Sequence, residues 1–504
     1  MFSRTDEKKV VLYGFITAVV TSVITAILQY ADFLSLYHRY KGKILAVTFV
    51  LLIASLIFLT LKHKLNEDTG AEFIFVVSSV IRSAYVLISG LYERQHDAGA
   101  YTGAATDFVN PGHIGYAEYI YKFGKIPQID PYSIFGYYHP PLHYIIEAIW
   151  IKINVLLGVS EECAFENMQI PTLFYSCLLI IICYQILSVL DIRGRNRIIA
   201  LAFIAFHPAT IIMSGSVNND MLTVLFMAIV ILLTLSYIRE KTVKTLVLLA
   251  LGIGFGMLTK LNAVVMAAPV GLVFLIHFIQ ICKTKNKSDI LLWVRNYIIF
   301  AILAMPIGLS WIIRNLIRFG KFPAALSPGT DSPMYTGDYS LWERIGIPGL
   351  SQWHFDFPFH PLRASACCNT WAIMFHTAIY AEEYPVDIEA PLLLLCQITF
   401  ILGIILAADV LIMLIKVCLD KRTAFEDRIF IMTGYIAIIF SFVVFVLVYP
   451  YTCSSDFRYI AICLVYSVIA IGLANKYKYK KIAVFNGAIF LFLVMIHIIY
   501  LLWW

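Results

Sequence analysis

Apolar runs of about 17–25 residues recur along almost the whole chain, and this pattern restricts the fold more than any other feature. Because ~20 apolar residues are needed to cross ~30 Å of hydrocarbon as a helix, each run has the length of a membrane span. Hydrophobic residues make up 60% of the 504 residues and charged residues only 14%, which excludes an ordinary soluble domain. The sequence therefore predicts an all-α polytopic membrane protein.

The distribution of Lys and Arg decides how many runs cross the membrane. Thirteen spans are expected near residues 10–30, 44–61, 72–92, 170–190, 197–213, 220–237, 244–258, 262–281, 292–313, 389–416, 428–449, 458–474 and 482–503. If the ambiguous run 142–158 does not cross, the basic loops fall on the same side as the N-terminal Lys8 and Lys9. Those loops are 193–197, 239–244, 283–287, 416–428 and 476–481. We therefore expect a cytoplasmic N-terminus, an external C-terminus and a juxtamembrane helix at 142–158. Because these cations lie in short loops, the net charge of +6 does not indicate nucleic-acid binding.

Polar groups that the positive-inside pattern does not explain gather at the predicted external helix ends. Asp97 follows the third span, and a carboxylate there could act as a general base on an acceptor hydroxyl or amine. A solvated carboxylate, or one paired with Arg94, is an equally open interpretation. Lys260, Arg314 and Arg458 stand at the same boundary, where they could bind a phosphate or extend to the membrane interface. Three such cations together favour an anionic ligand.

Imidazole and amide side chains near these ends give weaker signals. His139 and His143 flank a Pro-Pro pair, but two His without a clear third ligand are weak grounds for a metal, so we expect none. Asn219 and Asp220 begin a span, where they could cap the helix or contact a ligand. The ten Cys show no zinc-like spacing, and most lie in apolar runs as small buried thiols.

A series of short motifs follows in a fixed order from about residue 75 to 460. The motifs are Arg94-Gln95-His96-Asp97, Gly112-His113 with Tyr119, Gly124-Lys125-Ile126-Pro127, Tyr138-His139-Pro140-Pro141-Leu142-His143-Tyr144, Phe206-His207-Pro208, Asn218-Asn219-Asp220, Leu258-Thr259-Lys260, Trp311 with Arg314-Asn315, and Phe457-Arg458-Tyr459. In combination this series resembles the GT-C superfamily of integral membrane glycosyltransferases. The likeness is to bacterial relatives of the dolichyl-phosphate-mannose protein mannosyltransferases and of the lipid A aminoarabinose transferases. It implies a GT-C-like domain at 72–504, preceded by a two-helix N-terminal extension at 1–71.

The resemblance implies a function. Such enzymes transfer a sugar, with inversion, from a polyprenyl-phosphate donor to a lipid, glycan or protein acceptor on the external face of a membrane, here a bacterial plasma membrane. Asp97, in an external catalytic loop at 93–158 with juxtamembrane helices, would deprotonate the acceptor. Lys260, Arg314 and Arg458 would neutralise the departing lipid phosphate. The pocket would be completed by His96, His113, His139, Asn219, Asp220, Asn315 and Tyr459. No metal and no other cofactor is implied.

Some features stay open at this point. A second acid, if one takes part, would be Asp107 or Asp130. The long external segment 314–388 is rich in aromatic and His side chains, which could stack on sugars or anchor the loop, and Phe375 to Glu383 could line an acceptor entrance.

Two other functional classes remain. A polytopic lipid or solute transporter or flippase would favour inverted repeats and mid-membrane charges, which the sequence does not display, although Gly252, Gly254 and Gly256 loosen one helix. A membrane scaffold with a decayed site is the third class.

Overall fold

The computed structural model describes residues 5–33, 41–64, 66–93, 96–98, 110–323, 327–348, 359–382 and 389–503. Within these ranges the regular structure is helical, apart from one isolated bridge between Tyr335 and Tyr451. The chain divides into two compact units. Unit 1 is Met1–Leu201 with Ile211–Leu326, and unit 2 is Ala202–Thr210 with Ser327–Trp504.

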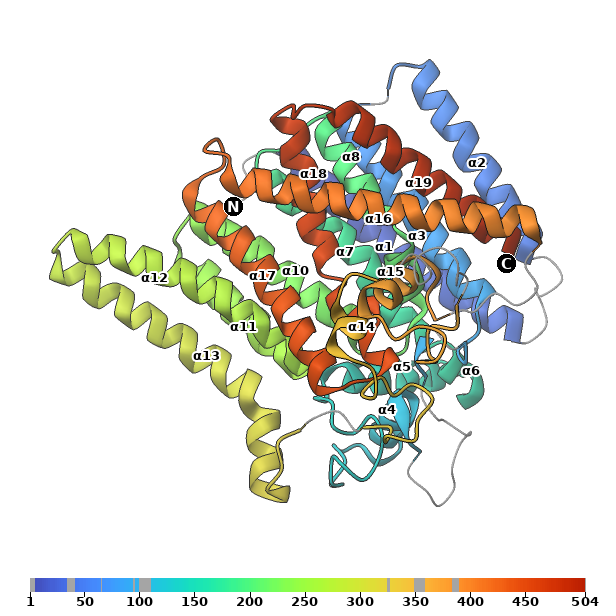
Figure 1. The fold of residues 1–504 in the computed structure, drawn as a ribbon, viewed down its shortest axis with the longest axis horizontal. Coiled ribbons are helices and arrows are strands. Elements are labelled where there is room, and N and C mark those ends of the chain that lie inside the picture. The colour runs from blue at the N-terminus through green and yellow to red at the C-terminus, as the bar shows by residue number, and fades with distance from the viewer. Residues whose placement is uncertain are drawn as a thin grey trace. The chain divides into compact units, whose positions relative to one another are not determined.

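Figure 1 shows the helices in their order along the chain. The first group is α1 (Thr5–Phe33), α2 (Lys41–Leu61), α3 (Glu67–Ile88), α4 (Gly112–Phe123), α5 (Leu142–Leu156), α6 (Glu161–Glu166), α7 (Gln169–Val189) and α8 (Arg195–Ala205). The second is α9 (Pro208–Ile212), η2 (Met213–Gly215), α10 (Asp220–Arg239), α11 (Val243–Thr259), η3 (Leu261–Met266), α12 (Ala267–Lys283) and α13 (Lys287–Phe319). The third is α14 (Leu341–Ile345), α15 (Thr370–Tyr380), α16 (Ala390–Leu419), α17 (Phe425–Val448), η5 (Thr452–Ser455), η6 (Phe457–Ile460), α18 (Cys463–Lys476) and α19 (Ile482–Trp503).

The predicted all-α polytopic fold is confirmed. Nine helices in the described ranges are long and apolar enough to cross a membrane, or up to eleven if each bent pair counts as one span. The count of thirteen stays a prediction, because α11 has 17 residues and reaches only ~26 Å. The ambiguous run 142–158 forms the 15-residue helix α5, which is not among these spans and packs against α4.

One of the bends has a local cause in the sequence. Helices α8 and α9 meet at an angle of 57° around His207. Pro208 has no N–H to continue the helical ladder, and its ring disfavours helical dihedrals at His207. The second bent pair, of 44°, joins the η5–η6 segment to α18.

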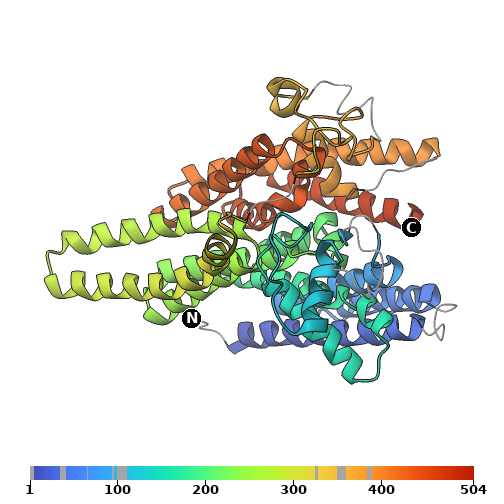
Figure 2. The same ribbon diagram turned by 90° about the horizontal axis from the view of Figure 1, so that it is seen from below.

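Helix α10 forms the centre of unit 1. It is apolar on all sides and mostly buried, because α7 and α11 pack against it. Helices α12 and α13 form a long hairpin beside α11 (Figures 1 and 2). Helix α1 packs on α3 and α7, so the first of the two predicted N-terminal helices lies within this unit.

Polar groups lie at or beyond both ends of α3. At its first residue, Glu67 pairs with the Arg197 Nε at 3.0 Å, and the same guanidinium reaches Glu7 of α1 at 3.1 Å. Arg193 adds a second contact to Glu7 at 2.7 Å. Helix α3 is ~33 Å long, and the loop that carries Asp97 follows its other end. The basic α7–α8 loop and the N-termini of α1 and α3 therefore share one end of unit 1.

Replacement of Arg197 by Leu is expected to destabilise the protein strongly. Its side chain is only 1% exposed, and the substitution leaves Glu7 and Glu67 without their shared guanidinium. Removing one partner of a buried ion pair costs about 3 kcal/mol, so the melting temperature should fall clearly. Arg193→Gln, at a side chain 33% exposed, is the matched control and should cost less than about 1 kcal/mol. Equal melting temperatures for R197L and wild type would contradict this role.

Candidate functional site

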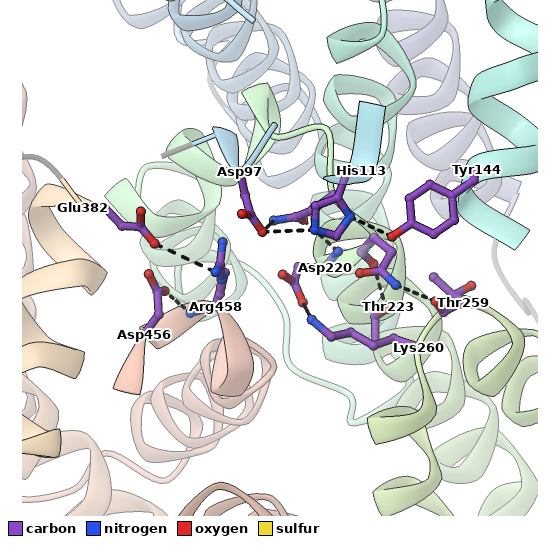
Figure 3. Close-up of polar contacts among 12 residues, drawn as sticks. Asp97, His113, Tyr144, Asp220, Thr223, Thr259, Lys260, Glu382, Asp456 and Arg458 are labelled. Atoms are coloured by element: carbon purple, nitrogen blue, oxygen red, sulfur yellow. Dashed lines mark hydrogen bonds and ion pairs between the residues drawn. The ribbon is translucent and has the colours of Figure 1, made fainter. Parts of the chain in front are cut away.

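Asp97 lies in unit 1 with its carboxylate held by two side chains from other parts of the chain (Figure 3). Its Oδ2 is 3.3 Å from the His113 Nε2 and 3.3 Å from the Asn218 Nδ2. The Asp97 backbone has φ +55°, a left-handed conformation that Asp tolerates better than most residues. The side chain is 24% exposed, so the carboxylate is oriented and still accessible to a reactant.

The proton positions on His113 follow from its two neighbours. Because a carboxylate only accepts hydrogen bonds, the Nε2 that faces Asp97 is the nitrogen that carries the proton. The Nδ1 then accepts from the Tyr144 hydroxyl at 2.7 Å. The imidazole also stacks on His139, with ring centroids 5.3 Å apart. Tyr144 therefore fixes the tautomer in which His113 supports the carboxylate.

Three buried tyrosines pack beside His113 and support its position. Tyr116 stacks on Tyr137 and Tyr144 with centroids 4.8 and 4.2 Å apart. The Tyr137 hydroxyl donates to the carbonyls of Asn110 and Gly115, both at 3.0 Å. Burial raises the pKa of Tyr144 well above its usual value, so its hydroxyl keeps the proton that it donates to the imidazole. The stack joins α4, which carries His113, to α5, which carries Tyr144.

His96 is an anchor of the loop and has no exposed surface. Its Nδ1–H donates to the Gly90 carbonyl at 2.7 Å, and its Nε2 accepts from the Tyr85 hydroxyl at 3.1 Å. Burial lowers its pKa to about 4, so the ring is neutral at physiological pH and matches these one-donor, one-acceptor surroundings. The His96 carbonyl accepts the Val217 N–H at 3.0 Å, which ties the loop to the segment before α10.

Another carboxylate, that of Asp220, lies at the first residue of α10 and pairs with Lys260 at the end of α11 (Figure 3). Asn218 links the two acids, because its Oδ1 accepts the Asp220 N–H at 2.9 Å while its amide nitrogen contacts Asp97. Asn219 points elsewhere and donates to the Thr259 carbonyl at 2.7 Å. The α10 N-terminus, the α11 C-terminus and the Asp97 loop therefore converge.

Arg314 and Trp311 in α13 bind the loop that precedes α5, whereas Asn315 hydrogen-bonds to its neighbours in α13, donating to the Trp311 carbonyl at 2.8 Å. Arg314 donates to the Pro127 carbonyl and to the Asn315 Oδ1, and its guanidinium lies over the Trp311 ring, 4.4 Å from the centroid. The Trp311 indole N–H donates to the Tyr138 carbonyl at 2.9 Å. Two of the five guanidinium donors are used in these bonds.

Arg458 and Tyr459 belong to unit 2. The Arg458 Nη2 is 3.8 Å from the Glu382 Oε1, and its backbone N–H donates to the Asp456 side chain at 2.8 Å (Figure 3). The Tyr459 ring packs on Phe445, with centroids 4.9 Å apart. An apolar groove of about 1100 Å³ also lies in this unit, between α15, α16, α17 and α18, and Phe457 is part of its wall.

The two candidate second acids differ. Asp130 pairs with Lys321 at 2.6 Å, and this contact lowers the pKa of its carboxyl. Asp107 lies outside the described residues, as do Arg94 and Glu383. No group of three or more His, Cys, Asp or Glu side chains suited to a metal is found within the described ranges.

Sequence reasoning missed the buried support of the site. It gave no role to Tyr144, Tyr85, Gln169 or Gly215, each of which contacts His113, His96 or their neighbours. A buried Gln at the start of an apolar span was the one available signal, because an amide in hydrocarbon needs a partner.

Gly215→Ala is expected to destabilise the protein, because a Cβ there would lie 2.7 Å from the His96 Nε2 and 2.9 Å from a Tyr85 ring carbon. Overpacking of this kind costs about 1–3 kcal/mol, measured as a lower melting temperature. Gly271→Ala in α12 is the control, since a Cβ there meets nothing within 4 Å. A G215A melting temperature no lower than that of G271A would refute the tight contact.

Comparison with known proteins gives one family match and several distant structural likenesses. The model of the dolichyl-phosphate-mannose-protein mannosyltransferase family matches residues 138–311. No curated protein matches the chain. The structure of ArnT from Cupriavidus metallidurans bound to undecaprenyl phosphate is similar at 16% identity and a TM-score of 0.34, over 79% of this chain and 76% of that one.

A second structure is the oligosaccharyltransferase of Archaeoglobus fulgidus in complex with Zn and sulfate, at 14% identity and a TM-score of 0.44. It covers 84% of this chain and 52% of its own, so this chain spans about half the length of that enzyme. Likenesses this distant assign no role to any residue. The family match over residues 138–311 confirms the resemblance predicted from the motifs: the chain is similar to the integral membrane glycosyltransferases of the GT-C superfamily.

Proposed function

We propose that this protein transfers a sugar, with inversion, from a polyprenyl-phosphate donor to a lipid, glycan or protein acceptor on the external face of the membrane. The observation that carries the proposal is the accessible carboxylate of Asp97, oriented by His113 and Asn218 in a part of the chain rich in fixed polar groups. The family match and the run of membrane-length helices support the same class.

In this mechanism Asp97 is the general base. Its carboxylate takes the proton of the acceptor hydroxyl or amine while the acceptor oxygen or nitrogen bonds to the anomeric carbon. The bond from that carbon to the phosphate oxygen breaks, and free polyprenyl phosphate leaves with the electron pair. His113 supports the orientation of the carboxylate from its Nε2, and Tyr144 holds the same ring at its Nδ1.

The departing phosphate needs positive charge. Lys260, Arg314 and Arg458 are the candidates, and they differ in how strongly the protein already engages them. Lys260 is paired with Asp220, so a phosphate would share its ammonium with that carboxylate. Arg314 uses part of its fork on backbone and amide oxygens, and Arg458 lies near Glu382. His139, Asn219, Asn315 and Tyr459 would shape the pocket.

The donor tail needs an apolar surface, and the groove of unit 2 is suited to it. At about 1100 Å³ it is slightly larger than the ~300–1,000 Å³ of most ligand pockets, and its wall is almost wholly apolar. Phe457 in its wall directly precedes Arg458, so an apolar channel and a cation adjoin. A long isoprenoid with an anionic head group is complementary to this combination of an apolar channel and a cation.

The decisive experiment is turnover by purified protein in lipid, with a panel of polyprenyl-phosphate sugars and candidate acceptors. Asp97→Asn should lose about 100-fold or more of the release of free polyprenyl phosphate, because the amide cannot take the acceptor proton. Asp130→Asn, on the same loop but paired with Lys321, should keep wild-type turnover. If D97N turns over as fast as wild type, the assignment of the base is wrong, and if no donor is consumed, the proposed function is wrong.

A second experiment tests the donor tail. Ala407→Trp fills the groove from α16 and should raise the KM for long polyprenyl donors about tenfold, while a short-chain analogue is used as before. Ile405→Trp, on the same helix at an exposed position outside the groove wall, is the control. An equal KM change for long and short donors would place the tail elsewhere.

A further inference from the structure

The N-terminal helix α1 is connected to the loop of Asp97 through a buried series of hydrogen bonds. We propose that Gln29 of α1 and Gln169 of α7 are positioning residues for Asp97, so that α1 belongs to the catalytic scaffold. The inference rests on the proposed function, because it assigns to two amides the task of holding the proposed base. All contacts in the series lie within unit 1.

The first step is the backbone of Asp97. It follows directly on His96, whose ring is held by Gly90 and Tyr85 and whose carbonyl accepts the Val217 N–H. With both the ring and the carbonyl of His96 engaged, the left-handed turn at Asp97 starts from a fixed point. Any displacement of the His96 ring therefore moves the carboxylate.

The second step is the contact between the His96 ring and Gly215. Gly215, the last residue of η2, lies so close that a Cβ on it would approach the His96 Nε2 to 2.7 Å. The Gly215 carbonyl accepts the Gln169 Nε2 at 3.1 Å. The same Nε2 is 3.1 Å from the His96 Nδ1, but that nitrogen already carries a proton towards Gly90, so the amide bond goes to Gly215.

The third step determines which way the Gln169 amide faces. Its Oε1 accepts the Gln29 Nε2 at 2.9 Å, and this bond keeps the Nε2 of Gln169 turned to Gly215. In the opposite orientation, the Gln169 oxygen would face the Gly215 carbonyl, and two acceptors would repel each other. Both Gln side chains are buried, where water cannot replace the lost partner. Gln29 on one side and the Gly215 carbonyl on the other thus favour the same orientation of the Gln169 amide beside His96.

Helix α1 also offers a matched control one turn away. The Thr25 hydroxyl is 2.6 Å from the Ser83 hydroxyl, a buried contact between α1 and α3 that does not lead to His96. Thr25→Val removes this contact, together with the bond from the Thr25 hydroxyl to the Thr21 carbonyl within α1, with almost no change in shape. A role of α1 in stability alone would make this variant resemble a Gln29 variant.

The test compares Gln29→Leu and Gln169→Leu with Thr25→Val and wild type in two measurements. In turnover assays, both Leu variants should lower kcat about tenfold with KM for the donor within about twofold of wild type, because misplacement of a base affects the reaction more than binding. T25V should keep both constants. In hydrogen-exchange measurements without donor, the Val217 amide proton should exchange faster in both Leu variants than in wild type. In T25V its exchange rate should equal that of wild type.

The two measurements separate this inference from the proposed function. Unchanged kcat and unchanged Val217 exchange in both Leu variants would overturn the positioning role, and so would an equal loss of kcat in T25V. If wild type consumes no donor, the proposed function fails, and equal Val217 exchange in all four proteins then overturns the positioning role as well.

Discussion

The cost of leaving a polar group unpaired in an apolar surrounding governs this structure. Spans such as α10 carry no charged side chain between their ends, and the hydroxyls of Thr223, Thr234 and Ser236 bond to carbonyls of the preceding turn. Where polar side chains do enter a span, they meet across helices, as Thr25 does with Ser83 and Gln29 with Gln169. The functional candidates are therefore found where several helix ends and a loop meet.

Charge within unit 1 is arranged in near-neutral groups. Arg197 is shared by two carboxylates at one end of α3, and Asp220 is paired with Lys260 near the other. Isolated charges in such surroundings would be expensive, and in these two clusters each ionised group lies beside an opposite charge. In the proposed function, a phosphate would meet cations that already have partners, and its affinity would depend on how easily those partners give way.

The long apolar helices could be predicted from the sequence because the length and hydropathy of an apolar run are local properties. The same reasoning placed Asp97, Asn219 and Asp220 at helix ends. It could not reveal that Tyr144 holds His113 or that Arg314 binds the Pro127 carbonyl, because these contacts join segments separated by many residues. Nor could it separate His96, an anchor, from His113, a partner of the carboxylate, since the two differ only in what surrounds them.

The apolar groove of unit 2 limits how much free energy the proposed binding of a polyprenyl tail could gain. A lipid that enters it leaves one hydrocarbon environment for another, so burying its tail gains little of the hydrophobic free energy that drives binding from water. If the groove binds the donor tail as proposed, bilayer lipids would compete for the same wall at very high local concentration. Selection must then come from shape, from the ordering of the chain and from the head group, and apparent affinity becomes a property of the membrane as much as of the protein.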